Sequence, residues 1–155
     1  EYEHLKGPIA QGDGPLWVSG KNPSVSQFSV YGSAHVGIFG GIIRGTSDKA
    51  ILQLNLLKTD FYHEKAFPSY LYYNPYPVDK TITIQVKEKG PIDLYNTVTG
   101  QFIARNKMST ARIRIPAKQA VVILFVPSGG KITHEGQKML VNGIVTDYHV
   151  SVNSQ

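Results

Sequence analysis

The stretch 69–130, SYLYYNPYPVDKTITIQVKEKGPIDLYNTVTGQFIARNKMSTARIRIPAKQAVVILFVPSGG, decides the fold of this chain. Apolar and polar side chains alternate in TITIQVK (81–87) and again in TARIRIP (110–116). Successive side chains of a strand point to opposite faces, so both segments are typical of half-buried strands. PIDLYN (91–96) and QFIAR (101–105) lie between them and predict two further strands joined by a turn.

The segment QAVVILFVP (119–127) differs because it is apolar on both faces. Such a strand is central in its sheet and has a cover on each side. We expect the outer cover to be the N-terminal segment or a domain outside this chain. Three shorter segments follow, KITH, KMLV and IVTDYHV, separated by Glu135-Gly136 and Asn142-Gly143. Asn-Gly between apolar alternating residues indicates a hairpin, so the three predict a meander.

The sequence therefore predicts a mainly β protein, an antiparallel β-sandwich over residues 69–155 that ends in a hairpin meander. Residues 1–30 are rich in Gly, Pro, Ser and Asn and predict an irregular arm. Residues 31–68 predict a short helix and a strand that pack on the sandwich. Helical spacing of Val36, Phe39 and Ile43 favours the helix despite its glycines, and AILQLNLLK (50–58) favours the strand.

Size, charge and cysteine content exclude several classes of function. The chain has 155 residues, no Cys and a formal net charge of +5. This excludes disulfides and cysteine-based zinc sites, and the scattered basic residues form no run that would indicate nucleic-acid binding. A mild positive field is better suited to an acidic polysaccharide. No apolar stretch is long enough to span a membrane. The first residues lack the order of a signal peptide, so the protein stays inside the cell or is a mature or trimmed form.

Few residues suggest chemistry. Asp60 and Glu64 are the one close acidic pair in an aromatic setting, and they would share a face only on a helix. His63 follows Asp60 by three residues, and His35 lies among small residues. We name His35, Asp60 and His63 as catalytic candidates, although solvated, capping or packing roles explain them more simply. No metal-ligand motif or phosphate-binding loop is present, so we expect no metal site and no cofactor.

A second set of residues suggests sugar binding through aromatic rings. The ligand-binding candidates are Trp17, Tyr31, His35, Tyr70, Tyr72, Tyr73 and Tyr76. Sugar rings present C–H faces that lie well on aromatic faces. The alternative is that tyrosines alternating along a strand pack in the core or at an edge of the sheet.

Four segments carry a resemblance to a known architecture: Tyr72-Tyr73-Asn74, and residues 80–86, 91–100 and 115–127. Their order resembles the C-terminal β-sandwich that follows the catalytic domain in many bacterial glycoside hydrolases and polysaccharide lyases. Residues 30–76 look like the end of an (α/α)-toroid catalytic domain passing into that sandwich. The chain departs from a complete enzyme of this kind, because 155 residues leave no room for the helical hairpins of a toroid.

The resemblance implies a non-catalytic accessory domain that packs on a catalytic domain of the same or a longer chain. It implies a secreted, periplasmic or cell-surface bacterial protein that acts on polysaccharide, with no activity in this chain alone. The expected partners are the catalytic domain and polysaccharide, without nucleic acid and without a membrane span. Two alternatives stay open: a free-standing carbohydrate-binding module using the tyrosines of 70–76, and an independent glycan-active enzyme.

Overall fold

The computed structural model describes residues 10–11, 28–29 and 37–150. The chain divides into two compact units, residues 1–41 and 42–155, and each is described by itself. In the first unit, strand β1 (Ala10–Gln11) pairs in parallel with β2 (Phe28–Ser29). A short helix covers residues 37–42, as predicted. Ile38 and Phe39 of this helix are exposed.

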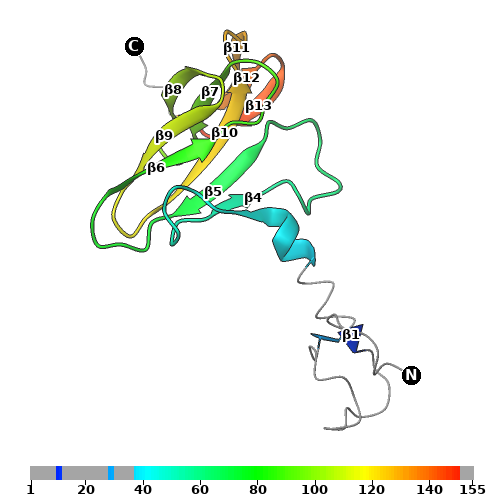
Figure 1. Cartoon of the computed structure of the whole chain (residues 1–155). Coiled ribbons are helices and arrows are strands. Elements are labelled where there is room, and N and C mark those ends of the chain that lie inside the picture. Colours follow the sequence, from blue (N-terminus) through cyan, green and yellow to red (C-terminus); the bar gives the residue numbers. More distant parts are fainter. Residues whose placement is uncertain (1–9, 12–27, 30–36, 151–155) are drawn as a thin grey trace, which may run out of the picture. The chain divides into compact units, whose positions relative to one another are not determined.

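The second unit consists of three antiparallel sheets (Figure 1). The largest has six strands in the order β3-β4-β5-β10-β7-β8. Its strands are β3 (Ile43–Arg44), β4 (Gln53–Asn55), β5 (Ser69–Tyr73), β7 (Ile92–Asn96), β8 (Gln101–Lys107) and β10 (Ala120–Pro127). A two-stranded sheet pairs β6 (Lys80–Gln85) with β9 (Thr110–Ile115). The meander contains β11 (Ile132–Glu135), β12 (Lys138–Val141) and β13 (Ile144–Asp147).

The mainly β fold with antiparallel sheets is confirmed and is consistent with the predicted sandwich. Strand β10 is central, as its two apolar faces predicted, and it pairs with β5 on one side and β7 on the other. One face of the six-stranded sheet packs against β6 and β9. We call this the inner core, and its buried residues are Ile51, Tyr70, Tyr72, Ile82, Ile84, Val86, Ile92, Leu94, Ala111, Ile113, Ile115, Val121, Ile123 and Phe125.

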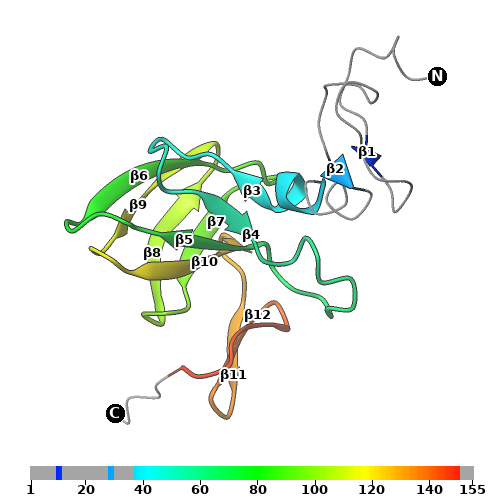
Figure 2. The same cartoon turned by 90° about the horizontal axis from the view of Figure 1, so that it is seen from below.

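The opposite face of β10 is covered by the chain's own C-terminal meander (Figure 2). We call this second set of buried residues the outer cluster; it contains Phe67, Tyr95, Leu124, Val126, Met139 and Val141. The expectation that the N-terminal segment or a separate domain covers this face was wrong. The meander strands are short and mostly polar toward solvent, and no local sequence signal indicates that they fold back onto the sheet.

Asn74 explains why an asparagine follows the tyrosines of β5. Its side chain is fully buried, and its Nδ2 donates to the backbone carbonyls of Val78, Ile115 and Pro116 at 2.9, 3.1 and 3.0 Å. Its Oδ1 accepts from the backbone N–H of Tyr76 at 3.0 Å. A buried carbonyl without a donor is costly, so one amide group holds the turn after β5 against the end of β9. The segment that carries the resemblance is therefore a packing and hydrogen-bonding device.

Gly130 allows the meander to approach β10. A Cβ atom at this position would lie 2.5 Å from Cγ1 of Val141 and 3.2 Å from the backbone oxygen of Pro127. Only glycine leaves room for that contact. Two of the turns within the meander carry glycines at positive φ, Gly136 and Gly143, as the hairpin signals predicted.

Candidate functional site

One notable surface of the second unit is an apolar edge, which we define as Ile43, Leu52, Leu56, Phe61 and Tyr62. The first three are on or beside the edge strands β3 and β4. Phe61 and Tyr62 lie in the loop between β4 and β5, and their side chains are 86% and 97% exposed. An aromatic pair with almost its whole surface in water gains nothing from burial within this fold.

Local hydrogen bonds shape the loop that carries this aromatic pair. Asn55 Oδ1 accepts from the backbone N–H of Leu57 at 3.0 Å, and Asp60 Oδ1 accepts from that of Tyr62 at 3.3 Å. Asp60 therefore caps a turn. Residues 56–68 contain no helix, so Asp60 and Glu64 do not share a helical face. His63 Nδ1 donates to the backbone carbonyl of Glu64 at 2.6 Å.

The other notable surface is an open cleft of about 1030 Å³ on the same side as the meander. It lies between the segment 63–69 on one side and 143–148, at the start and end of β13, on the other. Leu124 of β10 and Phe67 supply a buried apolar floor. We call this space the meander cleft. Its size is at the upper end of the range that small-molecule sites occupy.

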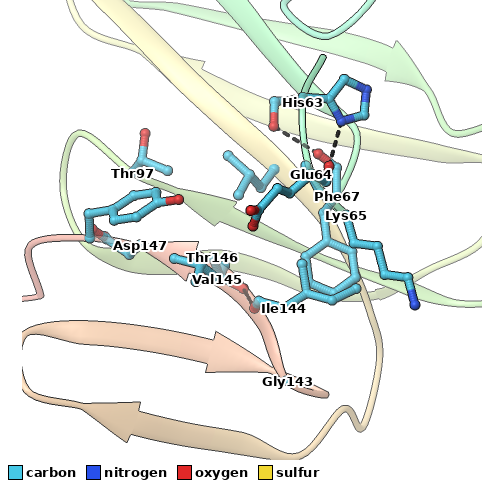
Figure 3. Close-up of a pocket in the computed structure, with 14 residues that line it drawn as sticks. His63, Glu64, Lys65, Phe67, Thr97, Gly143, Ile144, Val145, Thr146 and Asp147 are labelled. Atoms are coloured by element: carbon cyan, nitrogen blue, oxygen red, sulfur yellow. Dashed lines mark hydrogen bonds between the residues drawn. The ribbon is translucent and has the colours of Figure 1, made fainter. Parts of the chain in front are cut away.

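Polar residues line the meander cleft on both of its sides (Figure 3). The Glu64 carboxylate reaches into the space, with Thr97 and Asp147 across from it, whereas His63 and Lys65 extend away. Asp147 Oδ2 accepts from the Tyr95 hydroxyl at 2.6 Å. Burial, and then this hydrogen bond, raise the pKa of Tyr95 above its ordinary value, so the phenol is protonated at neutral pH.

The predicted aromatic site is divided by the structure. Tyr70 and Tyr72 are buried in the inner core, where Tyr72 accepts a hydrogen bond from Gln53 Nε2 at 2.9 Å. Their rings are not open to a ligand. Tyr73 is half exposed, and the Tyr76 hydroxyl donates to Asp48 Oδ1 at 3.0 Å.

The remaining candidates are placed only in part. Trp17, Tyr31 and His35 lie outside the described residues. His63 borders the meander cleft, whereas Asp60 does not line it, so the structure does not bring these two together in one site. Sequence reasoning missed Asp147 and Tyr148, because segments about eighty residues apart in sequence form the cleft and no motif connects them.

In residues 37–150, no group of three or more His, Asp or Glu side chains is arranged to hold a metal ion. No helix among the described residues is long and apolar enough to cross a bilayer.

Comparison of the chain with protein families, with characterised proteins and with solved structures finds no significant match in any of the three. Any function must therefore be argued from the sandwich, its apolar edge and its cleft.

Proposed function

We propose that this chain is a non-catalytic accessory domain that packs through its apolar edge on the catalytic domain of a polysaccharide-degrading enzyme. The observation that carries the proposal is the exposure of Phe61 and Tyr62, at 86% and 97%, in the loop that follows β4, together with three exposed aliphatic side chains on or beside β3 and β4. Large exposed apolar side chains gathered on one part of a protein are typical of interaction sites. Buried aromatic anchors supply much of the binding energy of protein interfaces.

The position of the apolar edge supports a partner that precedes the sandwich in the chain. The second unit begins at Ile42, and its first strand, β3, is an edge strand of the six-stranded sheet, with β4 beside it. A domain joined to the N-terminal side would thus reach this edge first. The proposed partner agrees with the resemblance of residues 30–76 to the end of a toroid domain.

The buried polar groups of the sandwich favour a structural role for this domain over a catalytic one. Buried side-chain nitrogen and oxygen atoms of the described residues all have hydrogen-bond partners. Asp93, one of the few buried charged groups, is used structurally: it accepts from Arg105, Ser128 and the backbone of Asn106 at 2.6, 2.6 and 2.9 Å. Burial alone would raise the pKa of Asp93, but these hydrogen bonds outweigh it and lower the pKa. The carboxylate thus stays ionised and engaged.

The first test is the mass of the native polypeptide in its source organism, detected with an antibody raised against this chain. The proposal expects a species several times heavier than 17.1 kDa, with the catalytic domain encoded upstream. A native species of 17.1 kDa would contradict an accessory domain of a longer chain.

The second test concerns the apolar edge of the isolated chain. We expect the chain to bind 1-anilinonaphthalene-8-sulfonate and to self-associate, and the double variant Phe61→Ser/Tyr62→Ser to lose most of both. Val98→Ser is the matched control, because Val98 is 62% exposed but lies away from the edge. Equal dye binding by the wild type and the double variant would show that the apolar edge is not the surface that binds the dye.

A further inference from the structure

We propose that the meander cleft is a binding site for a neutral oligosaccharide segment, with Glu64, Thr97, Asp147 and Tyr148 as its contacts. This site lies away from the tyrosines of 70–76. The inference rests on the proposed function only for the expectation that polysaccharide is nearby. The chemistry of the cleft stands by itself.

The meander cleft combines an apolar floor with hydrogen-bond acceptors. Phe67 and Leu124 form the floor and are both buried. The Glu64 carboxylate enters the cleft and makes no hydrogen bond within the described residues, so its oxygens are free to accept. A sugar ring matches both features, because it carries hydroxyl donors at its edge and C–H groups on its faces.

On the opposite wall, the carboxylate oxygens of Asp147 are held in fixed positions. Tyr95 is almost fully buried, and its hydroxyl holds Asp147 Oδ2 at 2.6 Å. Asp147 Oδ1 accepts from the backbone N–H of His149 at 2.9 Å. A carboxylate held at both oxygens loses little conformational entropy on binding, and each oxygen keeps a lone pair for a ligand hydroxyl.

Tyr148 supplies an aromatic side chain at the rim. It lines the cleft and is 61% exposed, and Lys138 Nζ lies 5.7 Å from the centre of its ring. This cation–π contact from β12 restrains the ring while leaving much of it in water. An exposed tyrosine beside free acceptors suits stacking against a sugar with the phenol tip in solvent.

The charges of the cleft favour a neutral ligand over an anionic or a cationic one. Glu64 reaches into the cleft and Asp147 lines it on the opposite side, so their negative charges would repel a uronic acid, although the chain as a whole has a formal net charge of +5. That net charge in turn disfavours a cationic ligand, and an ammonium group would leave the apolar floor uncovered. The local arrangement thus opposes the acidic polysaccharide that the overall charge suggested.

The test is a titration of the isotope-labelled chain with cellohexaose, mannohexaose and maltohexaose, followed by amide chemical shifts. Tetragalacturonate is the anionic comparison. We expect at least one neutral probe to shift the amides of Thr97 and of residues 143–148 at millimolar concentration or below, and tetragalacturonate to bind more weakly. The inference is overturned if all four probes leave these amides unmoved, if the shifts map elsewhere, or if tetragalacturonate binds most tightly.

Two variants assign the contacts. We expect Glu64→Ala and Tyr148→Ala each to weaken binding by about tenfold, the loss typical of one charge-assisted hydrogen bond or one aromatic contact. Both side chains are exposed, so the fold is retained, which the spectrum itself reports. Glu135→Ala is the matched control, because Glu135 is exposed on β11 outside the cleft. Equal losses in the variants and the control would overturn the assignment.

Failure here is distinguishable from failure of the proposed function. The cleft test uses this chain alone and reads the amides of 143–148. The test of the accessory role uses the native mass and the apolar edge. A silent cleft with a heavy native species leaves the accessory role in place, and the reverse result leaves a free-standing binding module.

Discussion

The two faces of strand β10 are buried in different ways. On the inner side, β6 and β9 are paired over six residues each, and apolar and polar side chains alternate along both strands. The apolar side chains that they direct inward are almost fully buried. On the outer side, a meander of short strands covers only Leu124, Val126 and their neighbours, and several contacting side chains are only partly buried. The inner core thus defines the fold, and the outer cluster attaches a cap that also forms one wall of a cleft.

The difference indicates that the meander side of β10 is the less stable side of the fold and the side on which a binding site can form. Removing the meander would expose the outer face of β10, whereas the inner core would keep both of its layers. Regions with fewer buried apolar contacts open at lower free energy. We therefore expect the outer cluster to exchange its amide hydrogens before the inner core.

We expect the largest loss of stability from truncating Tyr72 in the inner core. Its side chain is fully buried, so Tyr72→Ala should cost about 3–5 kcal/mol of unfolding free energy through lost burial and a cavity. Its neighbour Tyr73 is 49% exposed and points to the other face, so Tyr73→Ala should cost under about 1 kcal/mol. Urea denaturation measures both. Similar losses for the two variants would contradict the assignment of Tyr72 to the core.

A smaller effect separates the cap from the core. Gly130→Ala places a Cβ against Val141, and overpacking of this kind costs about 1–3 kcal/mol. Gly45 has open space around its Cβ position and no positive φ, so Gly45→Ala should be neutral or stabilising by up to about 1 kcal/mol. Hydrogen exchange should show Gly130→Ala loosening β12 while β6 and β9 keep their protection. Equal loosening of all strands would mean that the two sides of β10 unfold as one.

The smallest effect concerns the hydrogen bond between Tyr95 and Asp147. The folded-state pKa of Tyr95 is raised, first by burial and then by Asp147. Its contribution is fully present below pH about 10, the unfolded pKa, and is lost as the pH rises toward the folded pKa. Tyr95→Phe should cost about 1–2 kcal/mol at neutral pH.

The dependence of stability on the ionisation of Tyr95 is checked by comparing the denaturation midpoints of the wild type and Tyr95→Phe at alkaline pH. Their difference in stability should shrink above pH about 10. Tyr72→Phe is a comparison from the inner core, because burial also raises the pKa of Tyr72. A difference between wild type and Tyr95→Phe that stays constant up to strongly alkaline pH would contradict a raised pKa of Tyr95 in the folded state.

Much of the fold was predictable from sequence because alternation and turn residues are local signals. The strands at 81–87, 110–116 and 119–127 were predicted to within a few residues, and the Asn142-Gly143 hairpin was confirmed. Two-faced hydrophobicity correctly predicted that β10 is central. It could not say what covers the outer face, because burial in a strand shows that a cover exists without identifying it.

The candidate site was much less predictable. The tyrosines at 70 and 72 look equally suited to a core and to a sugar platform, since both uses need an aromatic ring on one face of a strand. Tyr70 and Tyr72 belong to the core because β6 and β9 cover the face of the sheet on which their rings lie. The meander cleft depends on a long-range contact between 63–69 and 143–148, for which no local periodicity exists.

The position of β10 in the sheet also constrains how the polypeptide matures on the ribosome. The strand is translated after β5 and β7 yet lies between them, so these two have no direct pairing with each other. A nascent chain that ends before residue 120 therefore has hairpins without a completed sheet. Emergence of residues 120–127 is the step at which a stalled-chain force or protease assay should first register a compact domain.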